Sequence, residues 1–213
     1  MASSPVARPD PPGAPATMHA VHCDGTRAAA LVTHPAGELL LVEPLAPVWA
    51  YSLLGMAPPG THVSHHTPID TTPLDAAYLF TAQHETIENT SLRFEPGSIR
   101  LVVDREAPDA CHLPPNPHRS RGHYWRVFAA RAVGELGKSP TMRSTRWVNR
   151  SELQVLANRT ISWTLGDVTD EQFHDTPGLR PVWVWWLHLL QMIEVDPRHA
   201  LHALAVAGRE DQR

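Results

Sequence analysis

The chain has 213 residues, of which 42% are hydrophobic and 19% charged, and this suits one globular domain with a single substantial core. Its net charge of −4 gives no electrostatic reason to bind nucleic acid, so we expect no such partner. Its two cysteines, Cys23 and Cys111, lie far apart and outside any C-x-x-C spacing, which argues against a structural disulfide or a zinc ribbon.

No targeting or membrane segment is apparent in the sequence. The N-terminus lacks a basic segment followed by an apolar run, so no signal peptide is predicted. The most apolar stretch, residues 181–193, is interrupted by His188 and Gln191 and is shorter than the ~20 apolar residues that span a bilayer. We therefore expect a cytoplasmic protein without membrane contact.

The N-terminal part of the chain predicts a tail followed by strands. Residues 1–16 are rich in Pro, Ala and Ser without periodicity, which indicates a disordered tail. Two apolar runs, 28–33 and 38–43, flank a turn that contains Pro and Gly, and this pattern predicts a β-hairpin. Residues 49–54 predict a third strand.

A central helix is expected over residues 73–90. Thr72 is a suitable N-cap, Pro73 suits the first helical position, and Asp75 is favoured at the positive end of the helix dipole. Between Asp75 and the end of the segment, apolar residues recur at mixed helical spacing.

The second half of the chain predicts strands and then helices. Strands are expected at 98–103, at 123–132 and, briefly, at 146–148. A helix capped by Asn149 or Ser151 comes after the last of these strands. A second helical segment is expected from about 181 to 207, with a break near Asp196 and Pro197. Strands on either side of a central helix indicate a mixed α/β domain.

Three polar residues of the central helix form the strongest motif in the chain. Residues three and four apart share a helix face, so Glu85, Glu88 and Asn89 are expected to project their oxygens toward one point. Carboxylate and amide oxygens are ligands that Mg²⁺ and Mn²⁺ take. The alternative is an ordinary solvated helix face.

Four pieces of the sequence, in order, resemble the Nudix hydrolase superfamily, whose signature is G-x5-E-x7-R-E-U-x-E-E-x-G-U with U apolar. They are the G-x-h-L-L-h strand at 37–42, the P-G-x-x-h loop at 59–63, the signature helix at 84–92 and the W-V and E-L pair at 146–153. By this resemblance the chain is identified as a divergent member with a degenerate signature. The fold implied is the Nudix α/β/α sandwich with a mixed β-sheet.

The resemblance also implies a domain organisation. A Nudix-like domain is expected over 17–160, preceded by the tail 1–16. Residues 161–213 are expected to form a C-terminal helical extension packed on the same domain.

The activity implied by the resemblance is metal-dependent hydrolysis of a phosphoanhydride in a nucleoside diphosphate derivative or a related phosphorylated small molecule. Glu85 and Glu88 stand where family acids bind Mg²⁺ or Mn²⁺ or serve the attacking water. Asn89 occupies a third ligand position, and His84 stands where an arginine orients the catalytic acid. The substrate loop is expected to include Gly60, Thr61 and His62.

Departures from the signature favour a second hypothesis. His84 replaces the arginine, Asn89 replaces an acid, and Thr61 and Ser91 replace glycines. The segment between Thr61 and His84 is also longer than the signature allows. The alternative is a catalytically silent or retooled Nudix-like domain that binds a small ligand or a protein partner.

Other side chains are candidates for the same site. His65 and His66 are candidate metal ligands, and Arg119 and Arg121 could clamp phosphates. The alternative for both pairs is a solvated loop without a functional role.

Aromatic residues offer two further expectations. Trp49 and Trp125 are the candidates for stacking on a substrate base. Trp183, Trp185 and Trp186 are expected in the core or in a homodimer contact.

Overall fold

The computed structural model describes residues 25–45, 55–63, 74–108, 122–137 and 139–207. Several predictions fall outside these ranges. They concern the tail, the strand at 49–54, the cap at Thr72 and five candidate site residues: Trp49, His65, His66, Arg119 and Arg121.

Seven strands form one mixed sheet in the order β4-β6-β1-β2-β7, with β3 paired to β1 and β5 paired to β6. Their bounds are β1 Thr26–Thr33, β2 Leu39–Pro44, β3 Gly60–His62, β4 Arg93–Phe94, β5 Arg100–Ala107, β6 His123–Val133 and β7 Met142–Val148. β1 and β6 run parallel, and every other pair is antiparallel.

Strand β1 lies at the centre of the sheet and is buried on both faces. Alternate side chains of a strand point to opposite faces. Ala28 and Val32 accordingly pack in the cluster that contains Tyr78 of the central helix, whereas Ala29 and Leu31 pack with the C-terminal helices. A strand covered on both sides reads as a continuous apolar run, as β1 does.

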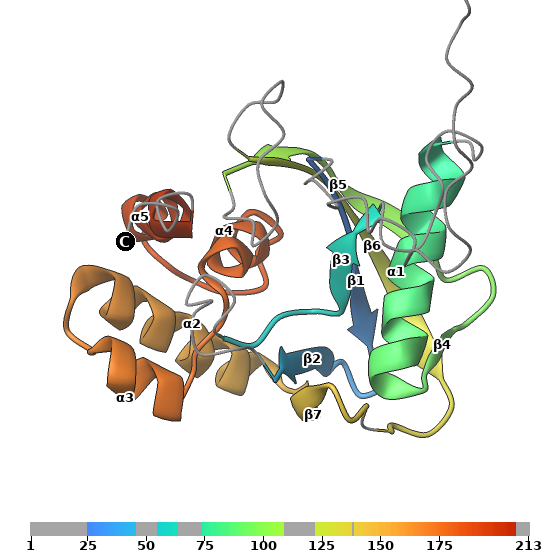
Figure 1. Ribbon diagram of the computed structural model, residues 1–213, viewed down its shortest axis with the longest axis horizontal. Coiled ribbons are helices and arrows are strands. Elements are labelled where there is room, and N and C mark those ends of the chain that lie inside the picture. The colour runs from blue at the N-terminus through green and yellow to red at the C-terminus, as the bar shows by residue number, and fades with distance from the viewer. Residues whose placement is uncertain (1–24, 46–54, 64–73, 109–121, 138, 208–213) are drawn as a thin grey trace, which may run out of the picture.

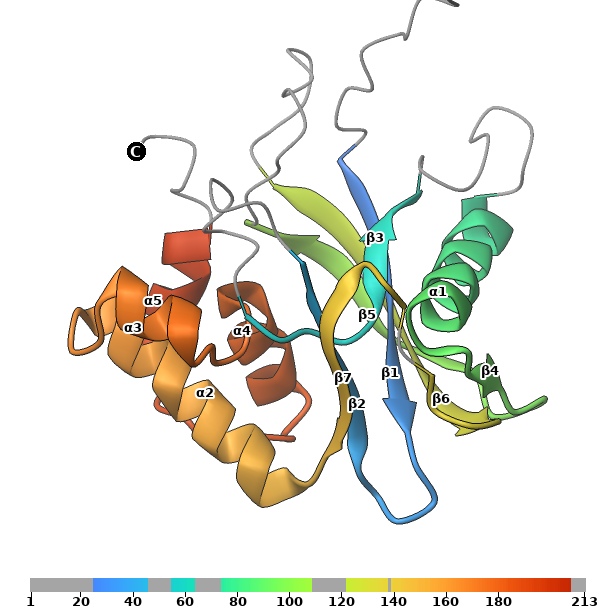
Figure 2. The ribbon, with the colours of Figure 1, turned by 60° about the horizontal axis from the view of Figure 1, so that its bottom comes forward.

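Helices cover both faces of the sheet (Figures 1 and 2). Helix α1 lies on one side, and α2, α3, α4 and α5 gather on the other. Their bounds are α1 Leu74–Thr90, α2 Arg150–Leu165, α3 Asp170–Asp175, α4 Pro181–Leu189 and α5 Pro197–Ala207. The predicted fold, a mixed sheet between the signature helix and the closing helices with further helices at the C-terminal end, is confirmed by these layers.

Local signals set the ends of the closing helices. Asn149 caps α2 in a capping box, since its side chain accepts from the Glu152 amide while the Glu152 carboxylate accepts from the Asn149 amide. Helix α2 runs across the expected boundary between the domain 17–160 and the C-terminal extension 161–213. The predicted break near Asp196 and Pro197 is present, because α5 begins at Pro197.

The indole rings contribute mainly to the core. Trp125 packs edge-to-face on Trp183 with ring centroids 5.6 Å apart, and on Trp186 at 6.5 Å. All three are buried, whereas Trp185 is only partly buried. The homodimer contact stays a prediction. Among the described residues no helix is long and apolar enough to cross a membrane.

Strand β3 replaces the loop expected at Gly60. A Cβ on Gly60 would lie 2.5 Å from the Ala29 Cβ and 2.6 Å from the Ala28 carbonyl oxygen. Glycine is therefore needed here for close approach of β3 to β1, which places the next two residues, Thr61 and His62, opposite Ala28 and Arg27.

Candidate functional site

The inner face of α1 carries Glu85 and Asn89. Asn89 is 7% exposed, and its Nδ2 donates a hydrogen bond to Glu85 Oε2 at 2.9 Å. Tyr78, Thr86 and Thr90 of the same helix are also buried, and their packing sets the rotation of the helix. Two of the three candidate ligands on this helix are therefore brought together.

Glu88 lies on the outer side of α1 and is not brought to the other two. Its side chain is 54% exposed and pairs with His84, with Nδ1 to Oε2 at 3.4 Å. The His84 ring also packs on Phe80, with centroids 5.6 Å apart. His84, expected to orient Glu85, is thus engaged with Glu88, and the two family roles assigned to them remain predictions.

Glu85 and Asn89 line a pocket of about 180 Å³ together with residues of β1, β2, β3 and β7 and the residue before α4. Gly60, Thr61 and His62 line the same pocket, so this group of predicted substrate residues does meet the signature helix. Arg27 of β1 and Arg180, which directly precedes α4, complete the charged lining.

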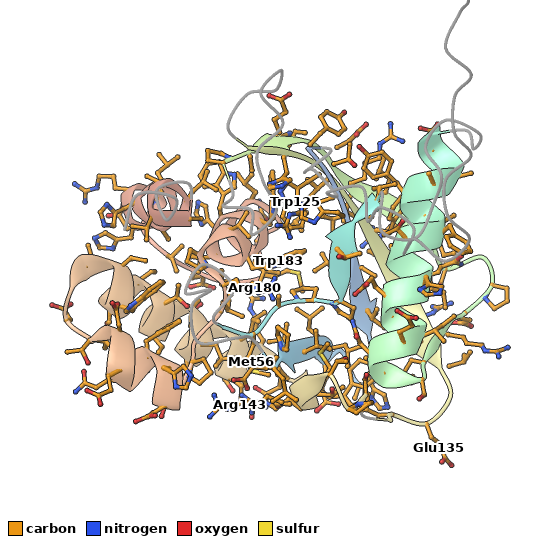
Figure 3. The ribbon with its side chains drawn as sticks, viewed as in Figure 1. Met56, Trp125, Glu135, Arg143, Arg180 and Trp183 are labelled. Atoms are coloured by element: carbon orange, nitrogen blue, oxygen red, sulfur yellow. The ribbon has the colours of Figure 1, made fainter. Side chains whose placement is uncertain are left out.

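Arg180 is held in place through its backbone. Its amide donates to the Met56 carbonyl at 2.9 Å, and the Met56 amide donates to the Gly178 carbonyl at 2.8 Å. The neighbouring Ala57 is hydrogen-bonded to Val42 of β2 in both directions. Figure 3 labels Arg180 and Met56 in the space between α4 and the sheet. The segment around Met56 thereby fixes the start of α4 against β2.

Arg27 is a buried cation. It is 4% exposed, and its guanidinium carbon lies 5.5 Å from the centroid of the Trp125 ring. A cation over an indole face is stabilised by the ring quadrupole, more so when desolvated. Trp125 therefore backs Arg27 and belongs to the core; it does not line the pocket as a stacking surface would.

His62 is joined to a second buried histidine. Its Nε2 lies 3.0 Å from the Nε2 of His123 on β6, and the two side chains are 0% and 2% exposed. One of these nitrogens donates and the other accepts. The pairing orients the His62 ring at the wall of the pocket.

The described residues of the pocket lack the donor set that Mg²⁺ or Mn²⁺ requires. These ions bind through oxygen ligands, chiefly carboxylates, phosphates and water. Glu85 is the only carboxylate among the described pocket residues, and two guanidinium groups line the same space. Across the described ranges no group of three or more His, Cys, Asp or Glu side chains could hold a metal ion. The described residues do not fit the metal centre that the resemblance implies.

A separate polar network anchors the first turn of α1 to the sheet. Arg126 pairs with Asp75 of α1 and donates to Asp104 of β5 at 2.9 Å, while its guanidinium carbon lies 5.0 Å from the Tyr78 ring. The Tyr124 hydroxyl, which donates to Asp104 at 2.7 Å, and the Arg126 guanidinium lower the pKa of Asp104. This network positions the helix that carries Glu85.

A larger hollow lies elsewhere. It has a volume of about 630 Å³, is open to solvent and is lined by residues of the α2 start and of the turn after α4. Arg150 and Glu194 pair across it at 3.2 Å. None of the motif residues borders this hollow, so the smaller pocket is the candidate site.

Three site residues were missed by sequence reasoning. Arg27 is a charge at the start of a buried strand, and a lone charge in an apolar run is the signal that could have singled it out. His123 stood out only as one of several basic residues before a strand. Arg180 carried no signal, because only tertiary packing brings it to the pocket.

Solved structures that resemble the chain are Nudix and MutT proteins. A MutT protein from Methanosarcina mazei shares 17% identity at a TM-score of 0.41, with 61% of this chain and 80% of that chain covered. A Nudix hydrolase from Nitrosomonas europaea shares 15% identity at 0.42, covering 62% and 76%. A C. elegans Ap4A hydrolase shares 14% at 0.35, covering 60% and 82%.

No family model matches the chain, and no curated protein matches it either. The similarity to the solved structures is too low in identity and TM-score to support any argument about activity. The fold assignment rests on the strand order and the helix layers, and the functional proposal rests on the pocket residues.

Proposed function

We propose that this chain, which has a Nudix-type fold, binds a small molecule in the pocket beneath α1. The observation that carries the proposal is the separation of the signature residues: Glu85 and Asn89 face the pocket, whereas Glu88 is paired with His84 on the outer side. The site retains a shaped and polar cavity but not the convergent acids of a metal centre.

The pocket has the mixed lining of a ligand site. Val42, Ala57 and Met142 supply apolar walls, and Glu85, Asn89 and Thr61 supply hydrogen-bonding groups. A few convergent polar groups in a mostly apolar concavity are typical of small-molecule sites.

Blocking the pocket tests the proposal. A panel of neutral, anionic and cationic small molecules is scanned by NMR chemical-shift perturbation against the wild type and Thr61→Trp. We expect pocket ligands to lose at least about tenfold in affinity, because the indole fills the cavity. Thr176→Trp, at an exposed position after α3, is the matched control. If every ligand binds Thr61→Trp as it binds the wild type, the proposal is wrong.

A second candidate function is hydrolysis of a phosphoanhydride, favoured by the presence of Glu85 in the pocket. Turnover of nucleoside diphosphate derivatives with Mg²⁺ or Mn²⁺ is the test. If the chain is a hydrolase, Glu85→Gln should lose about a hundredfold or more in kcat, the scale expected for a group that handles the proton. Glu88→Gln, at the exposed position, should retain most of the rate. Absence of turnover of any compound in the presence of either ion removes this candidate.

A further inference from the structure

We infer that Arg27 and Arg180 together form a two-guanidinium site for the anionic end of the ligand, so that the segment leading into α4 completes the site. This inference rests on the proposed function and specifies the ligand class of the same pocket. The anionic group is a phosphate or a carboxylate, both of which match the planar fork of arginine.

The charge of the lining is the first argument. Among the described residues that line the pocket, two are arginines and one, Glu85, carries a carboxylate. Arginine remains charged at every physiological pH. A cleft lined chiefly by charges of one sign attracts ligands of the opposite sign.

The construction of the site is the second argument. Arg27 is 4% exposed and backed by the Trp125 ring, so its guanidinium is held at the wall of the pocket and is largely shielded from solvent. Electrostatic attraction is stronger where water is excluded. The backbone of Arg180 is fixed by the bond between its amide and the Met56 carbonyl.

Arg180 comes from outside the region that resembles the Nudix family. It directly precedes α4, while Arg27 belongs to β1. The bridge between Met56 and Leu179 joins the two regions beside the pocket. The extension therefore supplies a ligand-binding side chain as well as core packing.

The size of the cavity limits what enters. The pocket measures about 180 Å³. Typical sites for drug-sized ligands measure about 300–1,000 Å³. One phosphate- or carboxylate-sized group fits with its nearest atoms. Glu85 is then placed to accept a hydrogen bond from a hydroxyl or amino group beside that anion.

Calorimetric binding of inorganic pyrophosphate, malonate and neutral glucose tests the inference. Pyrophosphate and malonate distinguish a phosphate from a carboxylate ligand, and binding of either one supports the anion site. Arg180→Gln should lower the affinity for that anion by about tenfold or more, as expected when a charge-assisted hydrogen bond is lost. Arg180→Lys should recover only part of the affinity, because lysine keeps the charge but not the fork.

Two variants guard the result against unfolding and general charge effects. Arg27→Gln should also lose about tenfold or more, but Arg27 is buried, so the partly exposed Arg180 provides the decisive variant. Arg150→Gln, which removes a cation at a side chain 70% exposed and away from the pocket, should leave the affinity unchanged.

The outcomes separate the inference from the proposed function. If neutral ligands bind in a manner sensitive to Thr61→Trp while neither anion binds, the two-arginine site is refuted and ligand binding stands. An anion that binds equally to the wild type and to Arg180→Gln also refutes the two-arginine site. If no ligand is sensitive to Thr61→Trp, both proposals fall.

Discussion

The hydrogen bond from Asn89 to Glu85 makes Asn89→Asp a sharp test of the site. In the wild type the Asn89 amide lies 2.9 Å from the Glu85 carboxylate, at a residue 7% exposed. The substitution loses a hydrogen bond to a charged acceptor, worth about 1.5–3 kcal/mol. It also places two carboxylates side by side, which repel by about 4 kcal/mol at a separation of about 4 Å and an effective dielectric constant of ~20.

Proton uptake limits the combined cost. In the folded variant the two adjacent carboxyl groups repel each other when both are ionised, so one of them binds a proton more tightly than it does in the unfolded chain. The folded variant then binds more protons than the unfolded one, so its stability falls as pH rises. We expect a free energy of unfolding about 2–4 kcal/mol below wild type near pH 8, with the difference shrinking toward about pH 5.

Urea denaturation at the two pH values is the assay. Asn158→Asp, at an exposed position on α2, is the matched control and should change stability by no more than about 0.5 kcal/mol. A variant as stable as wild type at pH 8 without metal would refute the pairing of residues 85 and 89.

Three further substitutions test the frame around the site. Gly60→Ala should destabilise the protein by about 1–3 kcal/mol, because the added methyl overlaps Ala29, and circular dichroism during thermal unfolding measures the loss. Arg126→Leu should cost about 1 kcal/mol at pH 7, since it removes a largely surface ion pair with Asp104. That deficit should begin to shrink as the pH falls below about 4 and continue to shrink through the lowered pKa of Asp104, because the carboxyl stabilises the fold only while it is ionised. Thr160→Val should cost about 1–2 kcal/mol in urea unfolding, since the buried hydroxyl bonds two carbonyl groups.

Controls and contrary outcomes for these three are specific. Gly97→Ala has open space around its Cβ but a φ of +76°, so it should show only the backbone strain, about 1 kcal/mol. Tyr124→Phe should raise the pKa of Asp104, which an NMR titration of that carboxyl would detect. An Arg126→Leu deficit that persists undiminished at pH 3, or a Thr160→Val variant more stable than wild type, would contradict the assignments.

The predictable parts of the fold are those with a local signal. The hairpin of β1 and β2 was indicated by two apolar runs around a turn, and the cap of α2 by Asn149 with Glu152 three residues on. Strand β3 had no such signal, since three residues show no alternation and pair only because Gly60 lets them approach β1. Helix α3 was missed because its six residues are too few to show a helical periodicity.

The site was predictable in part. Spacing alone placed Glu85, Glu88 and Asn89 near one face, but the rotation of α1 about its axis decides which of them enter the pocket. That rotation depends on the packing of Tyr78 and Thr86, which no spacing rule contains. Arg180 lies outside any motif and reaches the pocket only through the bond of its backbone to Met56.

The parallel pairing of β1 with β6 has a consequence for how the chain is made. Every residue of β1 from Thr26 to Thr33 pairs with one from Tyr124 to Arg131. Strand β1 leaves the ribosome long before β6 has been synthesised, so one edge of this apolar strand has no pairing partner during that time. Distant parallel pairings form slowly, and such an edge is prone to aggregate meanwhile. We expect a nascent chain cut before His123 to depend on chaperones, because the centre of its sheet is completed only by a strand from its second half.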